Sequence, residues 1–382
     1  MKLLPSAEEK AVPVASAIFR FTSGSTGTPK GVVIPHRGVL DYVDWVVDTF
    51  SVDERTVIGA QAPLFFDNST LDLWAAIASG ATLVLIPDAL FSFPVRLLEH
   101  LAEKRVTLVF WVPSVLTHVA SAGVLSRVPL PDLRDVLFAG EVLPTRVLNH
   151  WRDHLPGARF ANLYGPTEIT VDCTFWVVDR ELSDDEPIPI GLPCRNTDVL
   201  VLSDEGRRAD DGEVGELCVR GSSLALGYWR DAEKTAAAFV PNPLNPDYPE
   251  RIYRTGDLVR RNARGELVFV GRRDSQIKHL GYRIELGEIE AAIRSLPDVE
   301  DACVFYDAGA ARIEAAYVAA SPREAGALRR ALTDSLPRYM LPSAWHRLVA
   351  LPRTPNGKVD RERVRSLAGE RAGGREPEGG DL

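Results

Sequence analysis

The sequence predicts an α/β fold with a large N-terminal part and a small C-terminal part. Three changes in pattern along the 382 residues support this prediction. Apolar strand candidates alternate with helical stretches to about residue 187, short strands separated by turn signals follow to residue 273, and a compact α+β pattern begins near residue 274. Because alternating strands and helices are typical of parallel sheets with crossover helices, we expect such a sheet in the first segment.

Short apolar runs and helical spacing predict the elements of this first segment. An apolar run over 14–21 leads into a loop rich in Gly, Ser and Thr. The next strand candidates are 82–86, 108–112, 136–138 and 159–163. The intervening helices are predicted over 74–79, 94–103 and 145–154.

The second and third segments have shorter elements. Strands are predicted over 199–202, 216–220 and 266–270, with turn signals such as DEGRRADDG between them, which indicates a small, mostly antiparallel barrel or sheet over 188–273. Helical spacing of Leu286, Ile289 and Ile293 starts the third segment. Strands over 302–306 and 314–318 and a helix over 323–335 complete a C-terminal domain over 274–367. The Gly-rich, charged residues 368–382 are predicted to form a disordered tail.

The composition argues against several classes of protein. The chain has 44 basic and 53 acidic residues, a formal net charge of −9, which disfavours general nucleic-acid binding. Its four cysteines form no CxxC pair and indicate neither a disulfide framework nor a zinc site. No run is apolar enough for a membrane span, and no signal peptide is visible. We therefore expect a soluble, cytoplasmic protein without nucleic-acid or membrane partners.

The loop TSGSTGTPKG, residues 22–31, is the first motif with a chemical meaning. Glycines let backbone N–H groups approach a polyphosphate, hydroxyls add donors, and Lys30 adds positive charge. The loop is not a Walker A motif, because GK[ST] does not follow a glycine at the required spacing. By itself such a turn is more often a plain loop than a phosphate site.

Four later motifs strengthen the phosphate interpretation. NLYGPTE, residues 162–168, combines an aromatic ring, a tight turn, a hydroxyl and a carboxylate. YRTGDL places Asp257 in a turn, where its carboxylate can accept hydrogen bonds from two ribose hydroxyls. GRRDSQIKHLGYRIELGEIE spans the domain boundary, and NGKVDR presents a lysine near the C-terminus. Each motif also has a purely structural interpretation, but their combination favours a nucleotide-dependent enzyme.

The sequence resembles the adenylate-forming superfamily of acyl-CoA synthetases, firefly-type luciferases and nonribosomal-peptide adenylation domains. The resemblance spans about 19–361 and rests on motifs in the family's order: FTSGSTGTPKG, FDNS, NLYGPTE, GELCVRGSSLALGYW, YRTGDL, GRRDSQIKHLGYRIELGEIE, LPRYMLP and NGKVDR. YGPTE, LPRYMLP and NGKVDR are most similar to amino-acid-activating members, and FAGEVLP is similar to free-standing D-alanine-type carrier-protein ligases. The resemblance implies an adenylation core with a β-barrel and a mobile C-terminal lid domain.

The resemblance also implies roles for individual residues in binding ATP. Thr167 would bind the α-phosphate and Glu168 a magnesium ion. Tyr164 would stack on adenine, and Asp257 would hold the ribose. The other ATP or AMP contacts would come from the phosphate loop, the adenine-framing segments and an arginine, namely Thr22, Ser23, Gly24, Thr26, Gly27, Lys30, Gly140, Glu141, Val142, Asn162 and Arg272.

The resemblance also implies roles in the reaction for four residues of the C-terminal part. Lys358 would bridge the substrate carboxylate and the α-phosphate, whose mutual repulsion must be neutralised in the transition state. Asp274 would be the hinge about which the small domain rotates. Rotation would remove Lys358 and bring the Gly281–Tyr282 segment to the site for thioester formation.

The substrate acid is expected to be an amino acid. Asp67 in FFDNS occupies the position at which amino-acid-activating relatives bind the ammonium group, although an aspartate there can also cap a helix that begins near Thr70. The remaining pocket would be small to medium and mostly apolar, lined by Asn68, Leu71, Phe110, Leu137, Ala139, Leu163, Val171 and Asp172. Asp172 could recognise a hydroxyl or a second amine, so serine, alanine-like and short diamino acids remain open.

Two departures from the family pattern shape the expected function. The region that precedes the phosphate loop in relatives is reduced here to residues 1–20, which predicts a shortened enzyme, half of a split enzyme with a partner that supplies this region, or an inactive product. No carrier motif follows NGKVDR, so the thioester is expected on the phosphopantetheine arm of a separate carrier protein.

The expected function is ATP- and Mg²⁺-dependent amino-acid adenylation. One alternative is a ligase that joins a non-amino acid to coenzyme A, and another is a non-catalytic module that binds ATP.

Overall fold

The computed structural model describes residues 16–22, 30–273, 276–353 and 359–372. These residues divide into two compact units, one formed by 16–22 and 30–273 and the other by 276–353 and 359–372. Each unit has its own apolar core, and the two are considered separately.

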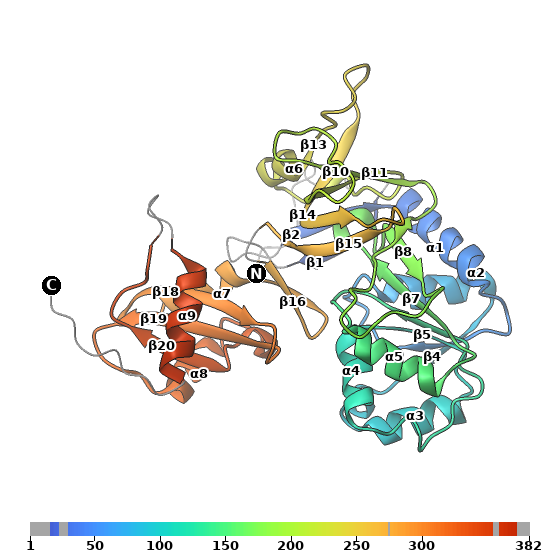
Figure 1. Cartoon of the computed structure of the whole chain (residues 1–382), viewed down its shortest axis with the longest axis horizontal. Helices are drawn as coiled ribbons and strands as arrows, with labels where there is room; N and C mark the ends of the chain where they lie inside the picture. Colours follow the sequence, from blue (N-terminus) through green and yellow to red (C-terminus); the bar gives the residue numbers. More distant parts are fainter. Residues whose placement is uncertain (1–15, 23–29, 274–275, 354–358, 373–382) are drawn as a thin grey trace, which may run out of the picture. The chain divides into compact units, whose positions relative to one another are not determined.

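A seven-stranded sheet is the centre of the first unit, and it has the order β4-β3-β5-β6-β7-β8-β9 (Figure 1). The first five strands in that order are parallel to one another. Strand β8 pairs antiparallel with β7, and β9 pairs antiparallel with β8. The predicted parallel sheet is thus confirmed. The strands are β3 Val57–Ala60, β4 Thr82–Leu85, β5 Leu108–Trp111, β6 Asp135–Phe138, β7 Arg159–Tyr164, β8 Thr174–Val177 and β9 Leu192–Pro193.

Helices cover both faces of this sheet (Figure 1). Helices α3 (Pro94–Glu103), α4 (Pro113–Ser121) and α5 (Thr145–His154) contribute to the core on one face. Helix α1 (His36–Phe50) and the π-helix η1 (Leu71–Ala75), which continues into α2 (Ala76–Ser79), contribute to the core on the other face. This double cover explains why β5 is a continuous apolar run and why β6 and β7 place apolar side chains on both of their faces.

Side chains of the central strands alternate between the two cores. On β5, Phe110 belongs to the core beneath α1, whereas Trp111 belongs to the core beneath α3–α5. Leu137 and Leu163 share the face of Phe110. The face beneath α1 therefore receives the residues that the sequence assigns to the substrate pocket.

Two antiparallel sheets complete the first unit. The small one has the order β1-β2-β12, formed by β1 Ser16–Thr22, β2 Lys30–Pro35 and β12 Gly227–Tyr228. The larger one has the order β10-β11-β14-β13, with β15 also paired to β14, which confirms the mostly antiparallel prediction. Its elements are β10 Thr197–Leu202, β11 Gly215–Gly221, α6 Ala232–Ala238, β13 Phe239–Pro241, β14 Arg251–Arg261 and β15 Leu267–Arg272.

The second unit is the predicted α+β pattern. A hairpin precedes a three-stranded sheet of order β18-β19-β20, in which β19 and β20 are parallel. Its elements are β16 Gln276–His279, β17 Tyr282–Glu285, α7 Leu286–Arg294, β18 Val299–Asp307, β19 Arg312–Ala319, α8 Ala325–Leu332, β20 Ala344–Leu348 and α9 Arg361–Ala372.

Helix α9 corrects one predicted boundary. The tail was expected to begin at residue 368, but α9 continues to Ala372. Ala368 is buried and packs in a cluster with Val364, Phe305 and Leu348, so apolar contacts extend the helix beyond the point at which Gly and charged residues become frequent. Residues 373–382 lie outside the described part of the chain.

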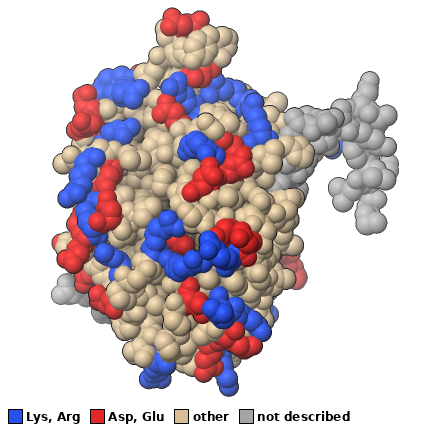
Figure 2. Space-filling model, turned by 90° about the vertical axis from the view of Figure 1, so that its right-hand side faces the viewer, with Lys and Arg blue, Asp and Glu red and all other residues tan. Residues whose placement is uncertain are grey.

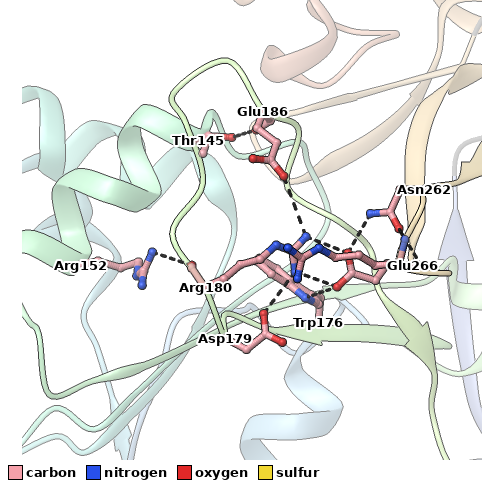
Figure 3. Close-up of polar contacts among 9 residues, drawn as sticks. Thr145, Arg152, Trp176, Asp179, Arg180, Glu186, Asn262 and Glu266 are labelled. Carbon is pink, nitrogen blue, oxygen red and sulfur yellow. Dashed lines mark hydrogen bonds and ion pairs between the residues drawn. The ribbon is translucent and has the colours of Figure 1, made fainter.

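A charged network joins the seven-stranded sheet to the larger antiparallel sheet (Figure 3). Arg180 donates to both carboxylate oxygens of Glu266 at 2.8 Å, and its guanidinium lies 4.8 Å from the centre of the Trp176 ring. Trp176 and Asn262 also donate to Glu266, at 3.1 and 2.8 Å. Burial would raise the pKa of Glu266, but the hydrogen bonds from Arg180 and Asn262 outweigh it and lower that pKa.

Elsewhere on the surface, charges of opposite sign are interspersed. On the face in Figure 2, Lys and Arg side chains lie beside Asp and Glu side chains. Exposed pairs of this kind, such as Arg207 with Glu213, contribute little to stability individually. No helix in the described residues combines the length and apolar character needed to span a membrane.

We predict that Glu266→Gln lowers the free energy of unfolding by about 2 kcal/mol at pH 7, because charged hydrogen bonds in a largely buried site contribute about 1.5–3 kcal/mol. Because the pKa of Glu266 is lowered in the folded protein, its ionisation stabilises the folded state at pH values above the unfolded carboxyl pKa of about 4.3. This stabilisation is lost as the pH falls through the lower pKa of the folded state. Denaturant unfolding at pH 7 and at pH 3–4 measures the difference.

The control is Glu213→Gln, which breaks an exposed bidentate pair with Arg207 and should cost at most about 0.5 kcal/mol. Equal costs for the two substitutions, or a Glu266 effect that does not shrink in acid, would contradict the assigned importance of the network.

Candidate functional site

The site residues gather at the carboxyl ends of the parallel strands. Ala139 follows β6, and the segment 165–173 joins β7 to β8. Ligands bind at this edge in open α/β sheets because helix starts and loops converge there. The motif NLYGPTE therefore begins within β7 and continues into the loop at the carboxyl end of that strand.

Close packing fixes the loop after β7. A Cβ atom added at Gly165 would lie 2.2 Å from the Val171 carbonyl oxygen and 2.6 Å from the Asp172 Cα, so only glycine fits. The chain then forms a short 3₁₀ turn, η3 (Thr167–Ile169). The hydroxyl of Thr167 donates to Oδ2 of Asp67 at 2.5 Å. The residues implied to bind the α-phosphate and the substrate ammonium thus meet, although 100 positions separate them.

Tyr164, Asp257 and Arg272 form a second cluster. Asp257 on β14 and Arg272 on β15 are paired in register. The Asp257 carboxylate accepts hydrogen bonds from the Tyr164 hydroxyl and from the Arg272 guanidinium, which is also its ion-pair partner. Burial and the charge of Asp257 raise the pKa of Tyr164 well above its ordinary value, so its hydroxyl remains a donor. These contacts hold in one place the residues assigned to ribose and adenine.

Glu168 is completely buried and contacts Tyr228 of the small β1-β2-β12 sheet. Its Oε1 accepts a hydrogen bond of 2.7 Å from the Tyr228 hydroxyl. The Lys30 ammonium lies 5.0 Å from the centre of the same Tyr228 ring. Tyr228 therefore links the carboxylate assigned to magnesium with the lysine at the end of the phosphate loop.

The segment assigned to adenine begins with Gly140, whose φ of +96° favours glycine. A carboxylate oxygen of Glu141 accepts from the Ser114 backbone amide at 3.0 Å, near the start of α4. Val142 is 70% exposed. Asn162 donates from its side chain to the Pro189 carbonyl at 2.8 Å, so the described contact of this amide is structural.

The apolar residues assigned to the substrate pocket share one cluster. Each is at most 3% exposed, and they are Leu71, Phe110, Leu137, Ala139, Leu163 and Val171. Phe110 and Leu137 are direct neighbours in the β5–β6 ladder. Asn68 is half-buried one turn before Leu71, whose amide donates to the Asn68 carbonyl. Asp172 is 3% exposed and accepts a hydrogen bond of 2.7 Å from the Tyr42 hydroxyl.

Within the second unit, Gly281 lies in the turn of the β16–β17 hairpin. Leu280 and Gly281 have φ values of 52° and 81° between the paired residues His279 and Tyr282. Positive φ at both central residues is typical of a two-residue hairpin turn. The Tyr282 ring stacks on Tyr339 with 3.5 Å between ring centres, which restrains the segment assigned to the thioester step.

Several predicted site residues lie outside the described part of the chain. They are Ser23, Gly24, Thr26, Gly27, Asp274 and Lys358. Thr22 is the last residue of β1 and is described only by its backbone, which pairs with Lys30.

The structure adds residues that the motifs did not single out. Tyr42, Tyr228 and Asp72 are all buried next to predicted site residues. Tyr228 lies inside the GELCVRGSSLALGYW motif, so its position could have suggested a role. Tyr42 fits the apolar pattern of an amphipathic helix and gives no functional signal. Burial raises the pKa of Asp72 well above its ordinary value, against the opposing effect of the Ala62 and Gln61 amides.

Two models of one enzyme family match this chain. The family model described as AMP-binding enzyme matches residues 3–229, and the model described as AMP-binding enzyme C-terminal domain matches residues 288–358. Together they include most of the residues discussed above.

Two similar proteins are a carrier-protein ligase and a peptide synthase. The chain is 39% identical over 370 residues to the L-proline–[L-prolyl-carrier protein] ligase of Streptomyces coelicolor, covering 95% of this chain and 67% of the ligase. It is 35% identical over 353 residues to tyrocidine synthase 1 of Brevibacillus parabrevis, covering 92% of this chain and 31% of the synthase.

A solved structure of the Vibrio cholerae adenylation domain AlmE in complex with glycyl-adenosine-5′-phosphate is similar in fold. It has a TM-score of 0.80 and 25% identity, with 92% of this chain and 66% of AlmE covered. The chain belongs to the AMP-binding enzyme family, which is the adenylate-forming superfamily, as the two family models and the identity to the proline ligase show.

Proposed function

We propose that the protein activates an amino acid with ATP as an aminoacyl adenylate, releases pyrophosphate and transfers the aminoacyl group to the phosphopantetheine thiol of a separate carrier protein. The contact between Thr167 and Asp67 carries this proposal. It places a carboxylate suited to an ammonium group directly beside the hydroxyl assigned to the α-phosphate. The names of the proline–carrier protein ligase and of the glycyl-adenylate complex support the same chemistry.

In the first step, an oxygen of the substrate carboxylate attacks the α-phosphorus, and pyrophosphate leaves with the electrons of the broken P–O bond. The nucleophile is already ionised and needs no general base. Two anions approach, so cations must stabilise the developing charge. We assign this work to Lys358, while Thr167 orients the α-phosphate; a magnesium ion, if held by Glu168, would supply further positive charge.

Glu168 fits a magnesium site that is completed by phosphates. Magnesium in nucleotide sites is commonly bound through one or two carboxylates together with substrate phosphates. Glu168 is buried and is oriented by the Tyr228 hydroxyl, and Lys30 lies on the same ring. When bound, the ion would neutralise phosphate charge; Glu168 would hold it in place.

In the second step, the carrier thiol, as its thiolate, attacks the acyl carbon and AMP leaves. We assign the Gly281–Tyr282 segment to this step and Asp274 to the hinge between the two steps. The turn geometry of Gly281 and the stacking of Tyr282 on Tyr339 support a segment of fixed shape.

Amino-acid-dependent pyrophosphate release, with Mg²⁺-ATP and a panel of α-, β- and diamino acids, tests the proposal. Strong release with one substrate class would support it. Activity only with simple acids and coenzyme A would favour a ligase of the acyl-CoA type. ATP binding without pyrophosphate release from any acid would favour a binding module, or an enzyme that needs another polypeptide.

We predict that Lys358→Ala reduces pyrophosphate release about 10²–10³-fold and leaves ATP affinity nearly unchanged, because a contact made mainly in the transition state affects rate more than ground-state binding. Single-turnover kinetics and nucleotide titration separate the two effects. Lys104→Ala, which removes an exposed lysine paired with Glu103, is the control. Unaltered turnover in Lys358→Ala would remove this residue from the mechanism.

We predict that Asp67→Asn raises the KM for the amino acid about 30-fold or more, because removing one partner of a charge pair formed on binding costs about 2 kcal/mol or more. The KM for ATP should change far less, since the asparagine oxygen can still accept from Thr167. Asp132→Asn, in an exposed pair with Arg105, is the control. An unchanged KM for the amino acid would show that Asp67 serves only the fold.

A further inference from the structure

Helix α1 carries a residue outside the recognised motifs that contacts Asp172, a residue assigned to the substrate pocket. Tyr42 is 4% exposed and Asp172 is 3% exposed, and the Tyr42 hydroxyl donates to Oδ2 of Asp172 at 2.7 Å. The two residues are 130 positions apart. A neutral phenol orients the carboxylate without supplying a positive charge.

The backbone around Asp172 is shaped to hold its side chain at this position. Thr170 and Val171 both have positive φ, 61° and 72°, which is unusual for a threonine and a β-branched valine. The Asp172 amide donates to the Thr170 carbonyl at 3.1 Å, and the Cys173 amide donates to the Tyr164 carbonyl at 2.7 Å. Asp172 is thereby fixed immediately beside the end of β7.

A glycine allows α1 to approach this segment closely. Gly38 lies one turn before Tyr42 and on the same face of the helix. A Cβ atom at Gly38 would lie 2.8 Å from the Thr170 hydroxyl oxygen. The same helix face therefore contacts Thr170 through Gly38 and Asp172 through Tyr42.

The surroundings of the Tyr42 hydroxyl keep it protonated. Burial, the charge of Asp172 and its hydrogen bond, and more weakly the charge of Asp67 raise the pKa of Tyr42 well above its ordinary value. The hydroxyl consequently remains a donor at neutral pH. Asp172 follows Val171 in the loop after β7, and Val171 and Leu163 belong to the apolar cluster beneath α1.

We propose, resting on the proposed function, that Tyr42 is a positioning residue that holds Asp172 as a fixed acceptor for the substrate side chain, and that this side chain is short and ends in an amine or a hydroxyl. Asp67 receives the ammonium shared by all amino acids. Asp172 receives the second donor, and an amine is preferred because a charged ammonium donor forms a stronger hydrogen bond to a carboxylate than a neutral hydroxyl does. An aliphatic side chain cannot donate a hydrogen bond to the Asp172 carboxylate, and a buried site discriminates strongly against such a substrate.

Pyrophosphate release with three side chains of similar size tests the proposal: 2,3-diaminopropionate, serine and 2-aminobutyrate, each as both enantiomers. The expected order of kcat/KM is diaminopropionate, then serine, with 2-aminobutyrate at least about 100-fold below the better donor. Tyr42→Phe should lower this ratio about 10-fold, through the KM of the donor-bearing substrate, with the KM for ATP unchanged. Asp172→Asn should abolish the preference for the diamino acid over serine.

Tyr317→Phe is the matched control, because Tyr317 is also buried and its hydroxyl accepts from the Arg323 amide at 3.2 Å in the second unit. Both tyrosine variants should lower the melting temperature by a few degrees at most, but only Tyr42→Phe should change the ratio. A ratio unchanged in Tyr42→Phe, or 2-aminobutyrate as the best substrate, overturns this inference and leaves the proposed function standing. No release with any amino acid overturns both.

Discussion

Carboxylates held by hydroxyl groups are the physical feature on which this site depends, and three of the four, Asp172, Asp257 and Glu168, are buried. Asp67 accepts from Thr167, Asp172 from Tyr42, Asp257 from Tyr164 and Glu168 from Tyr228. A carboxylate taken out of water needs hydrogen bonds, or it neutralises itself by taking up a proton. A hydroxyl donor fixes its direction and preserves its negative charge. Such an arrangement suits carboxylates whose task is to meet a cation or a sugar hydroxyl brought by a ligand.

Asp257 also forms an ion pair with Arg272. That pair neutralises the carboxylate before a ligand arrives, which is consistent with a role toward uncharged ribose hydroxyls. Asp67 and Glu168 are assigned to an ammonium group and to magnesium, for which retained negative charge is an advantage.

The parallel sheet explains how these groups reach one another. Strands β5, β6 and β7 are buried on both faces, so their positions are fixed by two apolar cores. Side chains beneath α1 line the proposed pocket, while those on the opposite face, such as Trp111, pack against α3–α5. The network around Glu266 then fixes the antiparallel sheet that contributes Asp257 and Arg272 (Figure 3). Rigid elements thus position a site whose residues come from both strands and loops.

The sequence by itself determined the alternation of strands and helices, the boundaries of α3 and α5, and the chemistry of the motifs, because apolar periodicity and local turn residues are encoded over a few positions. It did not determine the end of α9, where burial of Ala368 outweighed local composition. Only the tertiary structure decided that Tyr42 holds Asp172 and that Tyr228 holds Glu168. Those contacts join residues 130 and 60 positions apart, and they depend on how closely α1 and β12 pack against the edge of the sheet, which no local pattern records.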